Sequence, residues 1–346
     1  MVGTEPCFLY LSGEHSSLPR AEVLAILNSE GCPAFLLEEF PRVLRVGTSP
    51  KGRTVLAHRA GYTKQCCREL FICEASTAGI AEAVKDVDFR EHLLRGESFR
   101  VLVERVECKG LKSEKGLEEA LGEKIGDSVP GARVDLVNPD KTFFGLNVAA
   151  SFLFGIAHRR TGLRTYFRRP SLRPFFHPSA MLPKLARCMV NLARARASDV
   201  VLDPFCGTGS LLIEAGLMGC RTVGLDISKR MVQGAGRNLR FFGMRRCELI
   251  VADARRLPTR GFNCVASDPP YGRGSSTHGV DARLLVEGFM QEALDILPSR
   301  EHLCLAFPKG QALPELGEEL GYVTIERHEI REHKSLTRQV VVFRKP

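Results

Sequence analysis

Short apolar runs alternate with helical patterns throughout the second half of the chain, and few folds accommodate that order. From about residue 170, the runs that we expect to be strands cover 200–202, 222–225, 248–251, 262–266 and 302–307. The helical patterns that separate or flank them cover 179–195, 210–218, 229–242, 282–297 and 313–320. Strands that alternate with helices form a parallel sheet with helices on both faces. Two consecutive β-rich runs, 322–331 and 339–344, predict an antiparallel edge on that sheet.

The first half has a mixed α+β pattern. We expect helices at 19–28, 80–85 and 115–125, and strands at 98–108 and 132–137. The Gly, Pro and Ser residues of 47–52 indicate a turn or a domain boundary. The longest mostly apolar run, 143–157, has 15 residues, whereas a membrane span needs about 18 or more. We therefore expect a buried or amphipathic helix there and no membrane segment.

Composition is that of a globular, intracellular protein. The 346 residues allow two or three domains, and 44% hydrophobic residues can form a core. The first residues lack the basic segment of a signal peptide. No two of the 12 cysteines have C-x-x-C spacing, so neither a zinc ribbon nor a redox motif is present. We expect a cytoplasmic protein with reduced thiols and no metal.

Positive charge is concentrated in one stretch. Residues 141–198 contain no Asp or Glu but 11 Lys and Arg residues, which exceeds the formal net charge of +9. A solvated basic face is the ordinary explanation of such a cluster. An acid-free run of this length in an otherwise balanced chain favours a polyanionic partner, and we expect a nucleic acid.

A glycine-containing loop, Asp203-Pro-Phe-Cys-Gly-Thr-Gly209, follows the first predicted strand and opens a helix. Ligands of open α/β sheets bind at this position, and Gly207 and Gly209 let backbone N–H groups approach them. Leu212 stands where a dinucleotide fingerprint requires glycine, which argues against a nicotinamide dehydrogenase. Asp203 would repel a pyrophosphate and attract an ammonium group. No partner His lies near Cys206, so we interpret it as a small filler of the turn.

Acidic residues also end the next two strands. Asp226 lies 23 residues after Asp203, where an acid commonly binds ribose hydroxyls, and Asp253 is placed to accept from an adenine amino group. One such acid alone can be a helix cap. Three in register with the loop predict a ligand with an ammonium, a ribose and an adenine, which is S-adenosylmethionine. We assign its binding to Asp203, Phe205, Gly207, Gly209, Asp226, Ile227, Asp253 and Ala254.

The fourth strand ends in Asp268-Pro269-Pro270-Tyr271-Gly272. Two prolines fix φ and remove two N–H donors, so the carboxylate and carbonyls form an acceptor site for an exocyclic amine. Such an amine is a poor nucleophile, because its lone pair is delocalised into the ring, and acceptors on its protons favour attack. Tyr271 offers a face on which the base stacks. We therefore predict amine methylation with Asp268, Pro269, Pro270 and Tyr271 as catalytic residues.

These motifs resemble those of the class I, Rossmann-like amino-methyltransferases, and Phe175-Phe-His-Pro178 resembles the segment that covers the methionine end of the cofactor in such RNA enzymes. Residues 98–110 and 134–156 resemble a THUMP region with its associated ferredoxin-like part. With 168–181 and 333–338, nearly the whole chain is similar to the archaeal-type tRNA (guanine-10-N2)-methyltransferases. The resemblance implies these domains: ferredoxin-like 1–55, THUMP 56–155, linker 156–175 and methyltransferase 176–346.

The resemblance also implies a substrate, tRNA, methylated on N2 of guanosine 10, with RNA contacts from Arg168, Arg169, Arg273, Lys334 and Arg338. The Asp-Pro-Pro-Tyr motif would serve an N6-adenine methyltransferase on RNA or DNA equally well. An N2-guanine methyltransferase for another tRNA position, or a tRNA-binding protein without turnover, are further alternatives. Mono- or dimethylation, a monomer or an oligomer, and a helper protein all stay open at this stage.

Overall fold

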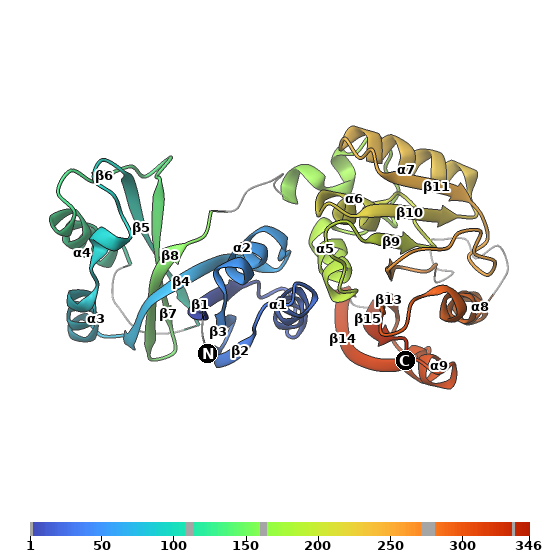
Figure 1. The fold of residues 1–346 in the computed structure, drawn as a ribbon, viewed down its shortest axis with the longest axis horizontal. Helices are drawn as coiled ribbons and strands as arrows, with labels where there is room; N and C mark the ends of the chain where they lie inside the picture. Colours follow the sequence, from blue (N-terminus) through green and yellow to red (C-terminus); the bar gives the residue numbers. More distant parts are fainter. Residues whose placement is uncertain (1–2, 108–113, 160–164, 271–280, 334–335) are drawn as a thin grey trace. The chain divides into compact units, whose positions relative to one another are not determined.

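The computed structural model describes residues 3–107, 114–159, 165–270, 281–333 and 336–346. Its contacts divide the chain into two compact units, each with its own sheet (Figure 1). Unit 1 comprises residues 1–14, 31–58 and 63–161, and unit 2 comprises residues 15–30, 59–62 and 162–346. No helix in the described part of the chain is long and apolar enough to cross a membrane.

Unit 1 is built on a sheet that has eight strands among the described residues, in the order β2-β3-β1-β4-β8-β7-β5-β6. The strands are β1 Glu5–Leu11, β2 Phe35–Phe40, β3 Val43–Thr48, β4 Thr63–Glu74, β5 Ser98–Val106, β6 Arg133–Val134, β7 Lys141–Val148 and β8 Ser151–Ala157. The α-helices that the described residues of this unit form are α2 Pro50–Arg59, α3 Thr77–Ala83 and α4 Glu114–Ser128. Strand β5 pairs in parallel with β6 and β7, while the other neighbours are antiparallel.

The predicted helix over 143–157 is wrong, because this run forms the antiparallel hairpin β7–β8. Side chains on both faces of the hairpin are buried: Phe143 belongs to one apolar cluster and Phe144 to another. A strand buried on both faces has no polar alternation, so its pattern does not differ from that of a buried helix. Ala149, with φ of 52°, turns the chain between the strands. A Cβ on Gly155 would lie 2.2 Å from the carbonyl oxygen of Arg68, so the close pairing of β8 with β4 requires glycine.

Two other expectations for the first half need correction. The expected turn at 47–52 is partly occupied by helix α2, and the expected strand 132–137 is reduced to the two residues of β6.

Unit 2 has a sheet in the order β11-β10-β9-β12-β13-β15-β14. Its strands are β9 Val200–Asp203, β10 Arg221–Asp226, β11 Cys247–Val251, β12 Cys264–Ser267, β13 His302–Pro308, β14 Val323–His333 and β15 Leu336–Arg344. The helices are α1 Leu18–Ser29, α5 Pro183–Leu192, α6 Ser210–Leu217, α7 Lys229–Phe241, α8 Ala282–Ile296 and α9 Leu313–Glu319. Strands β9 to β13 pair in parallel, and the β14–β15 hairpin adds an antiparallel edge. The predicted fold class, a Rossmann-like α/β sheet with an antiparallel edge, is therefore confirmed.

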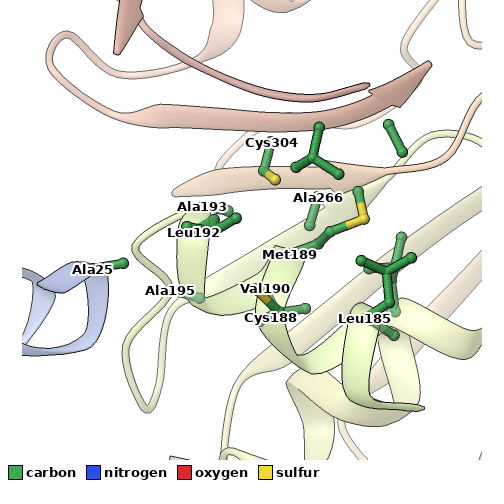
Figure 2. Close-up of a cluster of buried hydrophobic side chains, with 14 of the residues drawn as sticks. Ala25, Leu185, Cys188, Met189, Val190, Leu192, Ala193, Ala195, Ala266 and Cys304 are labelled. Carbon is green, nitrogen blue, oxygen red and sulfur yellow. The ribbon is translucent and has the colours of Figure 1, made fainter. Parts of the chain in front are cut away.

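Strand alternation divides the core of unit 2 between the two faces of its sheet. Ala266 and Cys304 lie in the cluster that contains the buried residues of α5, whereas Val265 and Leu303 lie in the cluster of α8 and α9. Figure 2 shows the α5 face, with Met189 close to the small side chains of β12 and β13. Small residues on these strands let α5 approach the sheet closely.

Helix α1 is part of unit 2 and is fixed there by a buried carboxylate. Glu22, fully buried, accepts hydrogen bonds from the backbone N–H groups of Gly61 and Tyr62 at 2.8 and 2.9 Å and from Asn191 Nδ2 at 2.8 Å. Burial raises the pKa of Glu22. The three donors offset the cost of desolvating this carboxylate, and they join α1, residues 59–62 and α5 into one packed layer.

We expect Glu22→Ala to destabilise unit 2 by about 3 kcal/mol or more, because the N–H groups of Gly61 and Tyr62 lose their acceptor and Asn191 Nδ2 keeps only its bond to the carbonyl oxygen of Arg59. Thermal or urea unfolding followed by circular dichroism measures this loss. Glu318→Ala removes an exposed carboxylate from α9 in the same unit and should change stability by less than about 0.5 kcal/mol. Equal unfolding transitions for the two variants would contradict the role of Glu22.

Candidate active site

Asp203 ends β9 with its side chain inside the protein. It is 1% exposed, and its Oδ1 accepts from Ser267 Oγ at 2.6 Å and from the backbone N–H of Phe205 at 3.2 Å. Burial raises the pKa of Asp203 to about 7, and the charges of Asp268 and Asp226 act in the same direction. A carboxyl group in this state gains most from a cation placed beside it.

The glycine loop that follows has the backbone form that its sequence predicts. Gly207 and Gly209 have φ of +50° and +82°, a region that favours glycine. A Cβ on Gly207 would meet only the carbonyl oxygen of Phe205, at 4.0 Å, so this side of the loop has room for a ligand. The ring of Phe205 packs edge-on against Phe289 with centroids 5.7 Å apart, which anchors the start of the loop.

Asp226 ends β10 beside this loop. Its Oδ2 accepts from the N–H of Gly207 at 3.0 Å and its Oδ1 from the N–H of Ser228 at 2.8 Å. These bonds fix the carboxylate next to the loop, where sequence reasoning places a ribose. The next side chain, Ile227, is apolar and 51% exposed, and such a surface suits the face of a flat ring.

The third predicted acid, Asp253, already has an internal partner. It accepts from Arg255 Nη2 at 2.7 Å and from the backbone N–H of Arg255 at 3.0 Å, and these bonds hold its pKa below the usual value. Ala254 beside it is buried. Parallel pairing of β10 with β11 sets Asp226 opposite Val251, so Asp253 follows at the same edge of the sheet.

Asp268 follows β12 and completes the row of acids. Strand β12 pairs with β9 in parallel, so Asp268 and Asp203 leave the sheet at the same edge. Asp268 Oδ2 accepts from Arg338 Nη1 at 2.9 Å. Pro269 is buried and Pro270 is half-buried. Three predicted site residues, Tyr271, Arg273 and Lys334, lie outside the described residues.

Two buried residues that sequence reasoning missed hold the loops together. Ser267 directly precedes Asp268 and donates to Asp203, which links the two acids. Asn238, fully buried on α7, accepts from the N–H of Phe175 and donates to the carbonyl oxygens of Phe175 and Thr208, all at 2.9 to 3.0 Å. A small hydroxyl inside an otherwise apolar strand was the available signal for Ser267.

Several arginines of the acid-free stretch 141–198 form ion pairs with acidic residues elsewhere in unit 2. Glu214, fully buried on α6, accepts from Arg168 Nε at 2.7 Å and from Arg187 Nε at 2.8 Å. Arg194 pairs with Glu326. The guanidinium of Arg168 is therefore turned inward, whereas its neighbour Arg169 is exposed and lies 4.9 Å from the ring centroid of the exposed Tyr166.

Among the described residues, no group of three or more His, Cys, Asp or Glu side chains is arranged so that it could hold a metal ion.

Comparisons with known proteins find relatives of this chain by sequence and by fold. The family described as RMKL-like, methyltransferase domain matches residues 170–339. The tRNA (guanine(10)-N2)-dimethyltransferase of Methanothermobacter thermautotrophicus is 36% identical over 96% of this chain and 97% of its own length. The protein of the same name from Methanocaldococcus jannaschii is 31% identical over 97% of this chain and 98% of its own. The crystal structure of TrmN from Thermus thermophilus has the same fold, with a TM-score of 0.57 at 19% identity over 99% of this chain and 100% of that one.

The raised pKa of Asp203 predicts how binding of a cationic ligand depends on pH. Below about pH 7 the free protein carries a neutral carboxyl at this position. A bound ammonium requires the carboxylate, so the affinity for S-adenosylmethionine should fall by up to about tenfold per pH unit below that point and level off above it. Calorimetry between pH 5.5 and 8.5 measures this.

Adenosine is the matched control ligand, because it keeps the ribose and the base but has no ammonium group. Its affinity should change little over the same range. If both ligands showed the same pH dependence, or if S-adenosylmethionine showed none, Asp203 would not be the group that faces the ammonium.

Proposed function

The chain belongs to the family of tRNA (guanine(10)-N2)-dimethyltransferases, and we propose that it transfers methyl groups from S-adenosylmethionine to the exocyclic N2 amine of guanosine 10 in tRNA. The observation that carries the proposal is the row formed by Asp203, Asp226 and Asp268 at one edge of the sheet, in a chain that matches its relatives along nearly their full length. The number of methyl groups added is proposed from the relatives' names, which specify two.

The residues of the edge fit S-adenosylmethionine group by group. Asp203 would hold the ammonium, Asp226 would accept hydrogen bonds from the ribose hydroxyls, and Ile227, Asp253 and Ala254 would border the adenine. The cofactor supplies an electrophilic methyl group on a sulfonium centre. The open side of Gly207, where a Cβ would have space, supports the placement of the methionine part against the loop. Asn238 keeps the 173–178 segment tied to this loop.

We assign to Asp268 the binding of the substrate amine. Its carboxylate accepts a hydrogen bond from the N2 amine, which directs the nitrogen lone pair away from the carboxylate and towards the electrophile. The new N–C bond would form as the bond between the methyl group and the sulfonium sulfur breaks, with that electron pair left on sulfur as a neutral thioether. The nitrogen would become cationic, and its extra proton would pass to Asp268 or to water. Pro269 and Pro270 keep the backbone beside the amine free of competing donors. We propose that the base stacks on Tyr271.

For the rest of the chain we keep the division implied by the resemblance: a ferredoxin-like part (1–55), a THUMP domain (56–155), a linker (156–175) and a methyltransferase domain (176–346). The amino-terminal domains would hold the acceptor end of tRNA. Arg169, exposed beside Tyr166, combines a positive charge with an aromatic ring, a pairing that suits single-stranded RNA. Arg273 and Lys334 are further proposed RNA contacts. The proposed location is the cytoplasm.

The test of the function is nucleoside mass spectrometry of an unmodified tRNA after incubation with the protein and S-adenosylmethionine. We expect N2-methylguanosine and N2,N2-dimethylguanosine, which should disappear when guanosine 10 is replaced by adenosine. Methylated adenine, or methylated guanine at another position, would overturn the assignment in favour of the alternative enzymes.

We expect Asp268→Ala to slow methyl transfer by at least about 10²-fold in single-turnover experiments, because the amine loses its proton acceptor. Its affinities for S-adenosylmethionine and tRNA should stay close to those of the unaltered protein. A rate near normal, or a loss explained entirely by weaker binding, would show that Asp268 has another role.

A further inference from the structure

The β14–β15 hairpin brings a positive charge to the edge where the acids gather. Strand β15 runs antiparallel to β13, so its first residues lie where the parallel strands end. The register pairs Arg338 with Pro308, the last residue of β13, and the N–H of Lys309 donates to the carbonyl oxygen of Thr337 at 2.9 Å. Arg338 is thus held at the same edge as Asp268 although 70 residues separate them in sequence.

The side chain of Arg338 must cross one strand to reach Asp268, because β13 lies between β15 and β12. Adjacent strands are about 4.8 Å apart, so the span is roughly 10 Å. On this face β13 presents small side chains, Cys304 and Ala306, in register with Val342 and Val340 of β15. Figure 2 shows this face from the side of α5, with Ala266 and Cys304 on neighbouring strands. Arg338, two residues before Val340, continues the same row on this face, and its long side chain reaches Asp268.

The ion pair itself is shielded from water. Arg338 Nη1 lies 2.9 Å from Asp268 Oδ2, and the side chains are only 13% and 16% exposed. Partly buried charges are screened less than surface charges, so the pair restricts the carboxylate more than an exposed pair would. A carboxylate accepts several hydrogen bonds at once, so a guanidinium and an amine can share it.

We propose that Arg338 is a positioning residue for methyl transfer: it fixes the orientation and the negative charge of Asp268 and does not serve as a contact to RNA phosphates. The proposal rests on the proposed function of Asp268. In this proposal the antiparallel β14–β15 hairpin contributes to catalysis, because Arg338 lies on β15. Sequence reasoning had placed Arg338 among the RNA contacts, where its charge would have been exposed.

A double-mutant cycle distinguishes a role of Arg338 in positioning Asp268 from a role as a contact to RNA phosphates. Arg338→Met should slow single-turnover methyl transfer at saturating tRNA by at least about tenfold while changing the Kd for tRNA less than about twofold. In an Asp268→Asn background, the same change should slow transfer further by less than about twofold, because the group through which Arg338 acts is already altered. Arg338→Lys should recover part of the rate.

Arg344→Gln is the matched control, because it removes an exposed arginine from the far end of the same strand. It should leave the rate unchanged. The proposal would be overturned if the effects of Arg338→Met and Asp268→Asn on the rate multiplied, or if Arg338→Met weakened tRNA binding and reduced its salt dependence, as the loss of a phosphate contact does.

The unaltered protein, Arg338→Met, Asp268→Asn and the double variant also provide a second cycle. It compares their unfolding midpoints and does not depend on enzymatic activity. Coupling between Arg338 and Asp268 in this cycle supports the ion pair, and additive shifts refute it. If the unaltered protein methylated no tRNA, the proposed function would fail, while the unfolding cycle would still decide whether Arg338 fixes Asp268.

Discussion

The cost of gathering and burying carboxylates at one edge of a sheet is the constraint to which the site of this protein responds. Parallel pairing brings Asp203, Asp226 and Asp268 to the ends of neighbouring strands, and the charges of Asp268 and Asp226 add to burial in raising the pKa of Asp203. Each acid has a different compensation. Asp203 is buried with the hydroxyl of Ser267, Asp226 accepts two backbone N–H groups, and Asp268 faces a guanidinium. Three acids of one residue type thereby acquire three different properties.

Pairing of charges inside the protein also explains why the net charge of a sequence segment does not predict the charge on the protein surface. The stretch 141–198 has no acid of its own, yet Arg168 and Arg187 share Glu214 inside unit 2. Breaking a buried pair of this kind is costly, because it leaves an uncompensated charge in a medium that solvates it poorly. Some of the basic residues that indicate a polyanionic partner therefore hold α6 in place, and Arg169 represents those that face the solvent.

The sequence was sufficient where local pattern determines structure. The strands of the second sheet and the acids that end them were predicted, because alternation and turn residues are local signals. The hairpin at 143–157 was predicted as a helix, since burial on both faces removes the periodicity. Glu214 and Arg338 received no structural role, because their partners lie 46 and 70 residues away and only the strand order brings them together. The local motifs therefore predict the type of reaction, whereas the residues that pair with the motif residues can be found only from the order of the strands.

The packing of α1 in unit 2 has a consequence for synthesis on the ribosome. This helix is translated between two strands of unit 1, yet Glu22 finds its partner Asn191 only 169 residues later. At about 5–20 residues per second, α1 must wait roughly 10–30 s after its own synthesis before α5 exists to receive it. During that interval Leu18, Ala21 and Ala25, which are buried in the finished protein, are without their native contacts. The apolar face of α1 therefore lacks its partner α5 for about half of the time that the chain takes to be translated, and chaperones that bind such segments have a defined period in which to act.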